Sequence, residues 1–147
     1  MRTLRIRHRP DSVMTVRRSN LWARRMVYFL VSNKGIKYPS GKRSRIIYIG
    51  TTKRGSERPA TSAAEKAIKA FMGLRGVKNV DLHIFTCQGR KHVKTWLALE
   101  SAFLAIFWER YFSLPHFNRK KGKDVDTDQV TLFRSARLRS VIRQFEE

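Results

Sequence analysis

Two apolar segments in the first third of the chain constrain its fold most strongly. Met26–Val31 and Arg45–Gly50 are rich in β-branched and aromatic residues, which favour β-strands. The stretch between them, Ser32–Ser44, holds two glycines and a proline and is therefore expected to be an exposed loop. The sequence thus predicts a hairpin of the two segments. Such a hairpin would bring Tyr28 of the first strand near Tyr48 of the second.

Three further patterns complete the predicted domain. A helix is expected to begin near Thr61 and to end at Gly73, because glycine commonly terminates helices. Val80–Phe85 alternates apolar and polar residues and predicts a third strand. His92–Tyr111 carries a broad apolar stripe and predicts the central core helix. Together these patterns predict a single α+β domain, with a small, mostly antiparallel sheet of three strands flanked by helices in the order β-β-α-β-α.

The first predicted helix has both a start signal and an apolar stripe. Ser62 is followed three residues later by Glu65, which fits a capping box in which each side chain satisfies an unpaired amide. Several alanines raise the helix propensity of the same segment. The residues expected to face the core are Ala64, Ile68, Phe71 and Met72.

Basic segments flank the predicted domain. Residues 1–24 are expected to be a basic N-terminal arm, and residues 119–147 a basic loop followed by a helix over roughly Val130–Phe145. The whole chain holds 32 Lys and Arg against 11 Asp and Glu, a net charge of +21. Nucleic acid is the expected partner of such a surface, because each neutralised phosphate releases counterions. Non-specific binding to a membrane surface is the weaker alternative, since no long amphipathic helix stands apart from the globular pattern.

The single cysteine and the lack of long apolar runs limit the class of protein. Cys87 has no second cysteine with which to form an internal disulfide, and no cysteine–histidine spacing suggests zinc. No apolar run approaches the length of a transmembrane segment, and the N-terminus has no secretory apolar segment. We therefore expect a cytoplasmic or otherwise intracellular protein associated with nucleic acid, neither secreted nor inserted in a membrane.

An acidic residue in an apolar helix adds chemistry to the hairpin. Glu100 lies among the apolar neighbours of the predicted core helix, where carboxylates are rare unless they are paired. Along the chain, the tyrosine on each strand is followed by Arg58 near the next helix, then by Glu100, and then by Asn118 after the core helix. Binding of nucleic acid alone requires no buried acid, so this order indicates more than a basic surface.

The ordered pattern resembles the GIY-YIG nuclease family. Val27-Tyr28-Phe29 stands where the family has Gly-Ile-Tyr, and Tyr48-Ile49-Gly50 matches the second element without change. Arg58, ten residues after the second tyrosine, stands at the place of the family's catalytic arginine, and Glu100 at that of its metal-binding glutamate. A Pro-x-x-Asn element ends at Asn118. The resemblance covers most of the chain, so residues 25–118 are expected to form a nuclease-like catalytic domain.

The resemblance implies metal-dependent hydrolysis of phosphodiester bonds in DNA. Glu100 would bind Mg²⁺ or Mn²⁺, and Arg58 would clamp the scissile phosphate with its planar guanidinium. One of Tyr28 and Tyr48 would activate the attacking water and the other would orient the water or the phosphate, an assignment that stays open. A phenol with a pKa of about 10 is a poor base, so nearby cations are expected to lower that pKa.

Several other residues have predicted roles around this site. Lys53 falls where some family members place a functional lysine, and with Arg54 it is the cation expected to act on the tyrosines. Asn118 is expected to support the site by hydrogen bonding, with a purely structural role as the alternative. Ser62 stands where some members carry a histidine, which argues against any mechanism that needs that histidine. The residues expected to contact nucleic acid are Lys42, Arg43, Arg54, Arg119, Lys120 and Lys121.

The main alternative is a non-catalytic, basic nucleic-acid-binding protein, which charge alone would favour. DNA is the expected partner of the nuclease, with RNA left open. One such site cuts one strand, so cutting both strands would require a homodimer, a second binding event or a partner protein. The sequence does not identify the target or the preference for single or double strands.

Overall fold

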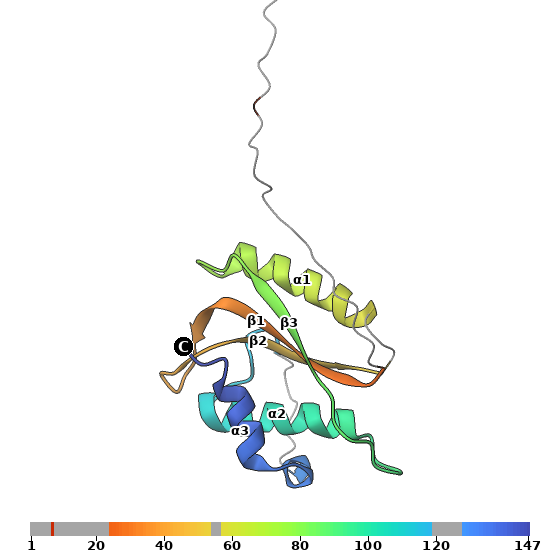
Figure 1. The fold of residues 1–147 in the computed structure, drawn as a ribbon. Helices are drawn as coiled ribbons and strands as arrows, with labels where there is room; N and C mark the ends of the chain where they lie inside the picture. The colour runs from red at the N-terminus through yellow and green to blue at the C-terminus, as the bar shows by residue number, and fades with distance from the viewer. Residues whose placement is uncertain (1–6, 8–23, 54–56, 119–127) are drawn as a thin grey trace, which may run out of the picture.

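The computed structural model describes residues 7, 24–53, 57–118 and 128–147, without the side chains of residues 57–60 and 128–129 (Figure 1). The strands form one antiparallel sheet in the order β2-β1-β3. The elements are β1 (Met26–Lys37), β2 (Arg43–Thr52), α1 (Glu57–Gly73), β3 (Val80–Phe85), α2 (Thr95–Tyr111), the 3-10 helix η1 (Asp128–Leu132) and α3 (Ser135–Arg143). The predicted α+β class, the three-stranded sheet and the β-β-α-β-α order are confirmed.

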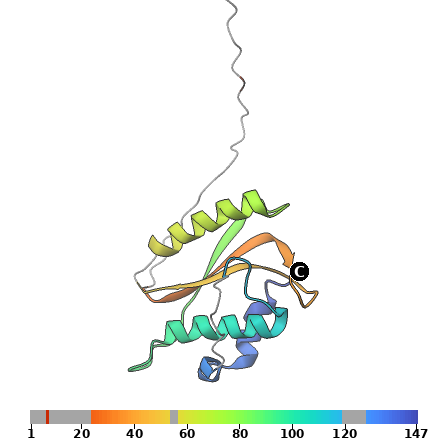
Figure 2. The same cartoon turned by 180° about the vertical axis from the view of Figure 1, so that it is seen from behind.

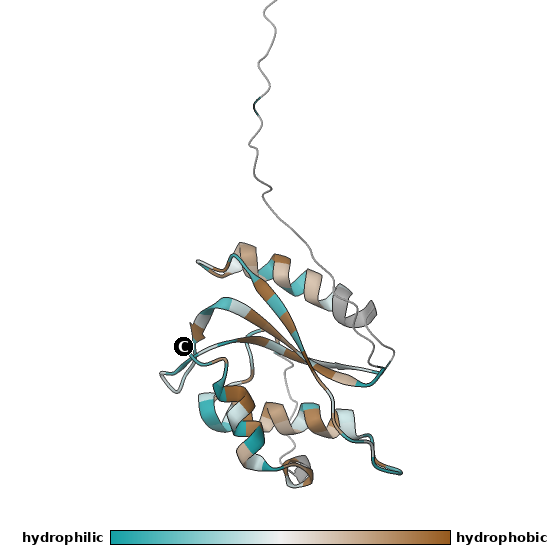
Figure 3. Ribbon diagram, in the orientation of Figure 1, coloured by the Kyte–Doolittle hydropathy of each residue, from teal (hydrophilic) through white to brown (hydrophobic). Residues whose placement is uncertain are grey.

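The elements stack in three layers. Helix α1 covers one face of the sheet, and α2 with α3 covers the other (Figures 1 and 2). Strand β1 is central and is buried from Met26 to Ser32, so its side chains alternate toward the two helical layers. Hydrophobic residues of β1 and β2 lie where these strands run between the helices (Figure 3).

The hairpin of β1 and β2 is longer than predicted. Most of Ser32–Ser44, expected to be an exposed loop, belongs to the strands, and only Tyr38–Lys42 connects them. The Tyr38 N–H donates to the Lys42 carbonyl at 2.9 Å, and the Gly41 N–H donates to the Tyr38 carbonyl at 2.9 Å. Gly41 has a φ of +83°, which glycine adopts without strain. The predicted loop is therefore wrong except at its tip.

The larger of two hydrophobic cores lies between the sheet and the layer of α2 and α3. Its sixteen buried residues include Phe29 of β1, whose ring centroid lies 4.4 Å from that of Phe85 and 4.8 Å from that of Phe103. The residues of the C-terminal segment in this core are Leu138, Val141, Ile142 and Phe145. The C-terminal helix is therefore part of the main core of the domain, although its other faces are basic.

The end of the chain binds both the hairpin and α2. The Arg45 N–H donates to the Phe145 carbonyl at 2.8 Å. The Arg110 guanidinium donates to both carboxylate oxygens of Glu146, at 2.5 and 2.8 Å. These bonds close the large core on the side of the hairpin turn.

Helix α1 begins earlier than predicted, and its predicted capping box does not form. The helix starts at Glu57, so Ser62 and Glu65 lie beyond its first turn. Ser62 Oγ instead accepts a hydrogen bond from Lys66 Nζ at 2.7 Å, and Glu65 pairs with Lys69 at 2.6 Å. Both bonds join residues one helical turn apart.

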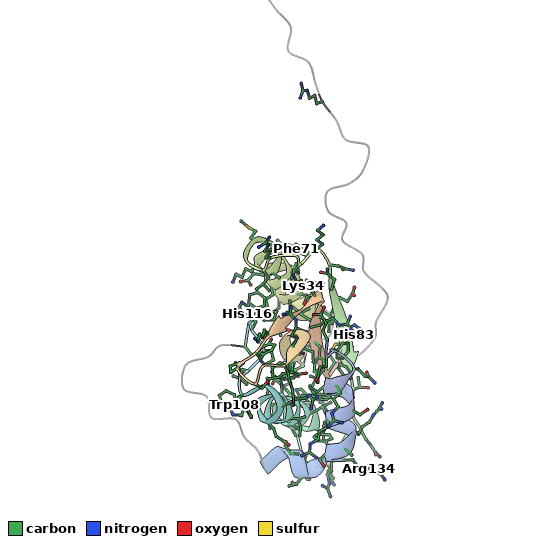
Figure 4. All side chains as sticks on the ribbon, turned by 90° about the vertical axis from the view of Figure 1, so that its left-hand side faces the viewer. Lys34, Phe71, His83, Trp108, His116 and Arg134 are labelled. Carbon is green, nitrogen blue, oxygen red and sulfur yellow. The ribbon has the colours of Figure 1, made fainter. Side chains whose placement is uncertain are left out.

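The buried face of α1 also differs from the prediction. Of the residues expected to face the core, Ile68 is 50% exposed, Phe71 37% and Met72 86%. Figure 4 shows Phe71 at the top of the molecule, on α1. Ala70 is fully buried instead, and together with Ala63 it packs in the smaller core. Small alanine side chains let the helix lie close to the sheet, which leaves the large apolar residues outside.

Helix α2 is the predicted core helix, although it begins at Thr95 rather than His92. It ends at Tyr111, and the next residue, Phe112, closes it with a left-handed φ of +56° while its N–H donates to the Trp108 carbonyl. None of the described helices is long and apolar enough to cross a membrane.

Candidate functional site

Tyr28 and Tyr48 lie next to each other on the face of the sheet that α1 covers. Their ring centroids are 5.8 Å apart, and the ring planes are tilted by 48°. Tyr28, on the central strand, is only 2% exposed, whereas Tyr48, on the outer strand β2, is half-buried. The structure thus brings together the two tyrosines of the predicted site, with Tyr48 the more accessible.

Glycine at position 50 makes this arrangement possible. Gly50 lies opposite Tyr28 in the β1–β2 register. A Cβ atom at Gly50 would lie 2.6 Å from Tyr48 Cε1 and 2.8 Å from both Cζ and the hydroxyl oxygen of Tyr28. The two rings therefore occupy the space that a side chain would need, which is a packing role for the glycine of Tyr-Ile-Gly.

Helix α1 contributes two side chains to the surroundings of Tyr48. Lys66 Nζ lies 4.1 Å from the centroid of the Tyr48 ring, the geometry of a cation–π contact. The same ammonium group donates a hydrogen bond to Ser62 Oγ at 2.7 Å. Ser62 in turn hydrogen-bonds with the Tyr48 hydroxyl. The phenol is therefore held between the sheet and α1.

The pKa of Tyr48 is raised well above its usual value. Burial of the phenol is the largest cause, followed by the Tyr28 hydroxyl and by the negative charge of Glu100, while the hydrogen bond from Ser62 acts in the opposite direction. The prediction that cations lower the pKa of the site tyrosines is therefore wrong for Tyr48. Lys53 is exposed just beyond the end of β2 and does not offset the burial.

Glu100 belongs to the other helical layer, and its charge reaches the Tyr48 phenol. It lies in α2 and is half-buried. β2 is an edge strand of the sheet, and α2 contacts it on the face opposite α1. Tyr48 is therefore the residue that links the two parts of the predicted site, because it packs against Tyr28 and its pKa responds to the charge of Glu100.

The donor set fits a magnesium ion held by a single carboxylate. Within the described part of the chain, no group of three or more His, Cys, Asp or Glu residues could enclose a metal. Mg²⁺ keeps several waters and commonly uses one or two carboxylates together with phosphate oxygens. Glu100, whose charge acts on the Tyr48 phenol, could supply one such ligand. A closed structural metal site does not match this donor set.

Arg58 lies in the first turn of α1, the helix that packs over the tyrosine pair. Its side chain is outside the described residues, so its predicted contact with the scissile phosphate stays a prediction. Arg54 also falls outside the described residues.

Asn118 binds the free edge of the sheet. Its Oδ1 accepts a hydrogen bond from the Ile49 N–H at 2.8 Å, and its Nδ2 donates to the Ile49 carbonyl at 2.6 Å. The Phe117 N–H donates to the Ile47 carbonyl at 2.9 Å. The Pro-x-x-Asn element therefore runs along β2 and satisfies backbone groups beside Tyr48, bonds that fit both the supporting role and the purely structural role predicted for Asn118. Figure 4 shows His116 of this element on the side of the molecule opposite His83 of β3.

The predicted nucleic-acid contacts are described only in part. Lys42 is exposed at the tip of the hairpin. Arg43 is half-buried, because its guanidinium donates to the Gly35 carbonyl at 2.5 Å and pairs with Glu147 at 3.4 Å. Arg119, Lys120 and Lys121 lie outside the described residues.

Three residues near the tyrosines have no predicted role in the chemistry of the site. Lys66 and Ser62 are separated by one helical turn, a spacing that signals an interaction once the helix is known to start at Glu57. In the sequence, Gly50 is noted only as the last residue of the Tyr-Ile-Gly motif. Its place opposite Tyr28 on the paired strand is the signal that a ring packs closely there.

Comparisons with known protein families, with curated proteins and with solved structures found no match to this chain.

Proposed function

We propose that the protein is a metal-dependent endonuclease that hydrolyses phosphodiester bonds of DNA at the Tyr28–Tyr48–Glu100 site. The observation that carries the proposal is the packing of the two tyrosines together with the effect of the Glu100 charge on Tyr48. The tyrosine rings from adjacent strands lie 5.8 Å apart, and the carboxylate of a helix in the opposite layer acts on one of the phenols. A surface that only binds phosphates gains nothing from a carboxylate whose charge reaches one of the phenols, because negative charge repels the ligand.

The two tyrosines have different roles in this proposal. Tyr48 is half-buried on the outer strand, and its raised pKa keeps it protonated at neutral pH. A neutral phenol donates a hydrogen bond, so Tyr48 would orient the water or a phosphate oxygen rather than remove a proton. Tyr28, packed beneath it, would hold the Tyr48 ring in place and would accept the hydrogen bond from its hydroxyl while no substrate is bound.

Glu100 would hold Mg²⁺ or Mn²⁺ by one carboxylate. When bound, the metal would supply positive charge for the phosphate oxygens and lower the pKa of a bound water. The charge of Glu100 raises the pKa of Tyr48, so a cation at this carboxylate would weaken that effect. Arg58, in the first turn of α1, is the proposed clamp for the scissile phosphate.

A net charge of +21 supports nucleic acid as the substrate and also supports the second candidate, a non-catalytic nucleic-acid-binding protein. The two functions differ in what Glu100 does. In a binding protein this carboxylate is a local cost, and its removal would leave binding unchanged or stronger. In a nuclease its removal slows cutting strongly and leaves binding intact.

Nicking of supercoiled plasmid DNA separates the candidates. The wild type, Glu100→Gln and Glu109→Gln would be compared with Mg²⁺, with Mn²⁺ and with a chelator. Glu109 is a matched control, because it lies in the same helix, is exposed, and pairs with Arg139. Loss of about 3 kcal/mol of transition-state stabilisation predicts a roughly hundredfold slower rate for Glu100→Gln, with Glu109→Gln near wild type.

DNA binding measured in parallel by fluorescence anisotropy completes the test. The nuclease proposal expects the three proteins to bind alike while only Glu100→Gln cuts more slowly. Wild type that binds DNA but cuts nothing with either metal would reject the nuclease and leave the binding protein. Equal cutting by Glu100→Gln would remove Glu100 from the mechanism.

A further inference from the structure

The Lys66 ammonium contacts a phenol and a serine rather than forming an ion pair with the neighbouring Glu65. Glu65, its neighbour in sequence, pairs with Lys69 at 2.6 Å. The Lys66 ammonium instead lies over the Tyr48 ring at 4.1 Å and donates to Ser62 Oγ at 2.7 Å. Burial lowers the pKa of this amine, so the placement carries a desolvation cost. A solvent-facing lysine on the exposed side of α1 would avoid that cost.

Ser62 is the second unusual choice on this helix. Serine in a helix interior is less favourable than alanine, because its hydroxyl competes for backbone hydrogen bonds. Ser62 Oγ is instead engaged by Lys66, and its hydroxyl is directed to Tyr48. Two residues that each cost α1 some stability therefore converge on one phenol.

We propose that Lys66 and Ser62 are positioning residues that set the direction of the Tyr48 hydroxyl. The inference rests on the proposed nuclease function and assigns Tyr48 its role within it. The Lys66 ammonium donates to Ser62 Oγ, so the Ser62 O–H is free to donate to the Tyr48 oxygen. The Tyr48 oxygen then receives a proton from the α1 side, and its own O–H points away from α1, toward Tyr28 or a bound phosphate. Tyr48 is thereby fixed as a donor.

A double-mutant cycle between Ser62→Ala and Tyr48→Phe tests the coupling without any need for activity. Helix propensity alone predicts that Ser62→Ala raises the Tm slightly whether or not the phenol hydroxyl is present. The proposal expects the loss of one hydrogen bond to lower the Tm when Tyr48 is intact. The change caused by Ser62→Ala should therefore differ by about 3 °C between the wild type and the Tyr48→Phe variant. Ser140→Ala, at an exposed serine of α3, is the matched control and should show no such difference.

Catalysis gives the second readout. Ser62→Ala should lower kcat for plasmid nicking about tenfold with KM changed less than about twofold, and Ser62→Thr, which keeps the hydroxyl, should restore most of it. Lys66→Met should act in the same direction, whereas Lys69→Met, three residues further along α1, should leave kcat unchanged. A purely structural role of Ser62 would not give this split between kcat and KM.

The outcomes separate the two proposals. A wild type that never nicks DNA overturns the proposed function and with it the catalytic role of these residues, whatever the stability cycle shows. Nicking by the wild type with an additive stability cycle, or with full kcat in Ser62→Ala, overturns the positioning role alone. A non-additive cycle together with a kcat loss that threonine restores supports both.

Discussion

Replacing Gly50 with alanine adds one methyl group at the most crowded point of the site. The new Cβ would lie 2.6 Å from Tyr48 Cε1 and 2.8 Å from Tyr28 Cζ. Carbon atoms in ordinary contact are about 3.5 Å apart, so each ring has to move away from the new Cβ by roughly 1 Å. Tyr28 is 2% exposed and cannot swing into solvent, and its hydroxyl lies equally close to the added atom.

The magnitude follows from two opposing terms. Overpacking of a buried site costs about 1–3 kcal/mol. Alanine also restricts the unfolded chain more than glycine does, which raises the free energy of unfolding by about 0.4–1 kcal/mol. We therefore expect Gly50→Ala to lower the free energy of unfolding by about 1–2 kcal/mol, which is roughly 2–8 °C in Tm for a chain of this size.

Gly73→Ala is the matched control. Gly73 is the last residue of α1, and a Cβ there would meet nothing within 4 Å. The same chemical change should therefore leave stability unchanged or raise it by about 0.5–1 kcal/mol. Urea unfolding followed by far-ultraviolet circular dichroism measures both variants. A Gly50→Ala protein as stable as the wild type, or a Gly73→Ala protein that loses as much, would refute the packing argument.

Two other predictions concern the edge of the sheet and the end of the chain. Asn118→Ala removes the side-chain partners of the N–H and carbonyl of Ile49. It should lower the free energy of unfolding, measured with urea, by about 1–3 kcal/mol. An unchanged unfolding midpoint would show that water replaces both bonds. Hydrogen bonds from Arg110 lower the pKa of Glu146. The ionised carboxylate therefore stabilises the fold at pH values above its ordinary pKa of about 4.3. This stabilisation is lost as the pH falls through the lowered pKa. Glu146→Gln should therefore lower the free energy of unfolding by about 1 kcal/mol at neutral pH and by progressively less below about pH 4. An equal loss of stability in these two pH ranges would contradict the role of the ion pair.

The strands are predictable where the sequence is apolar and not where long-range partners hold the chain. Local sequence from Asn33 to Gly35 favours a loop. In the structure, Asn33 Oδ1 accepts from the N–H groups of Lys78 and Asn79 at 2.9 and 3.0 Å, and the Gly35 N–H donates to Glu147 at 2.6 Å. These partners are 45 to 112 residues away in the sequence, so no local pattern reveals them.

The buried face of α1 shows a different limit of prediction. The larger side chains, such as Ile68 and Met72, have the greater hydrophobic transfer energy, and periodicity alone favours burying them. The sheet instead takes the alanine face, with Ala70 fully buried. The wrong helix start also hides the contact of Ser62 with Tyr48. A serine at the helix N-cap would bond the backbone with its hydroxyl. Because α1 starts at Glu57, Ser62 lies beyond the first turn and its hydroxyl reaches Tyr48 instead.

The candidate site spans two helical layers of unequal size. Among the described residues, the core under α2 and α3 holds sixteen buried residues, and the core under α1 holds four. Glu100 is therefore held by the larger core, whereas Arg58, Ser62 and Lys66 belong to a helix that attaches mainly through alanines. Hydrophobic stabilisation scales with buried apolar area, so α1 is expected to separate from the sheet at a lower free energy than global unfolding. The hydrogen bond and cation contact to Tyr48 then act in both directions, because α1 orients the phenol and the phenol helps to hold α1 in place. Under the proposed function, substrate phosphate clamped by Arg58 would add to the same attachment, so DNA binding would help to order the part of the site that α1 carries.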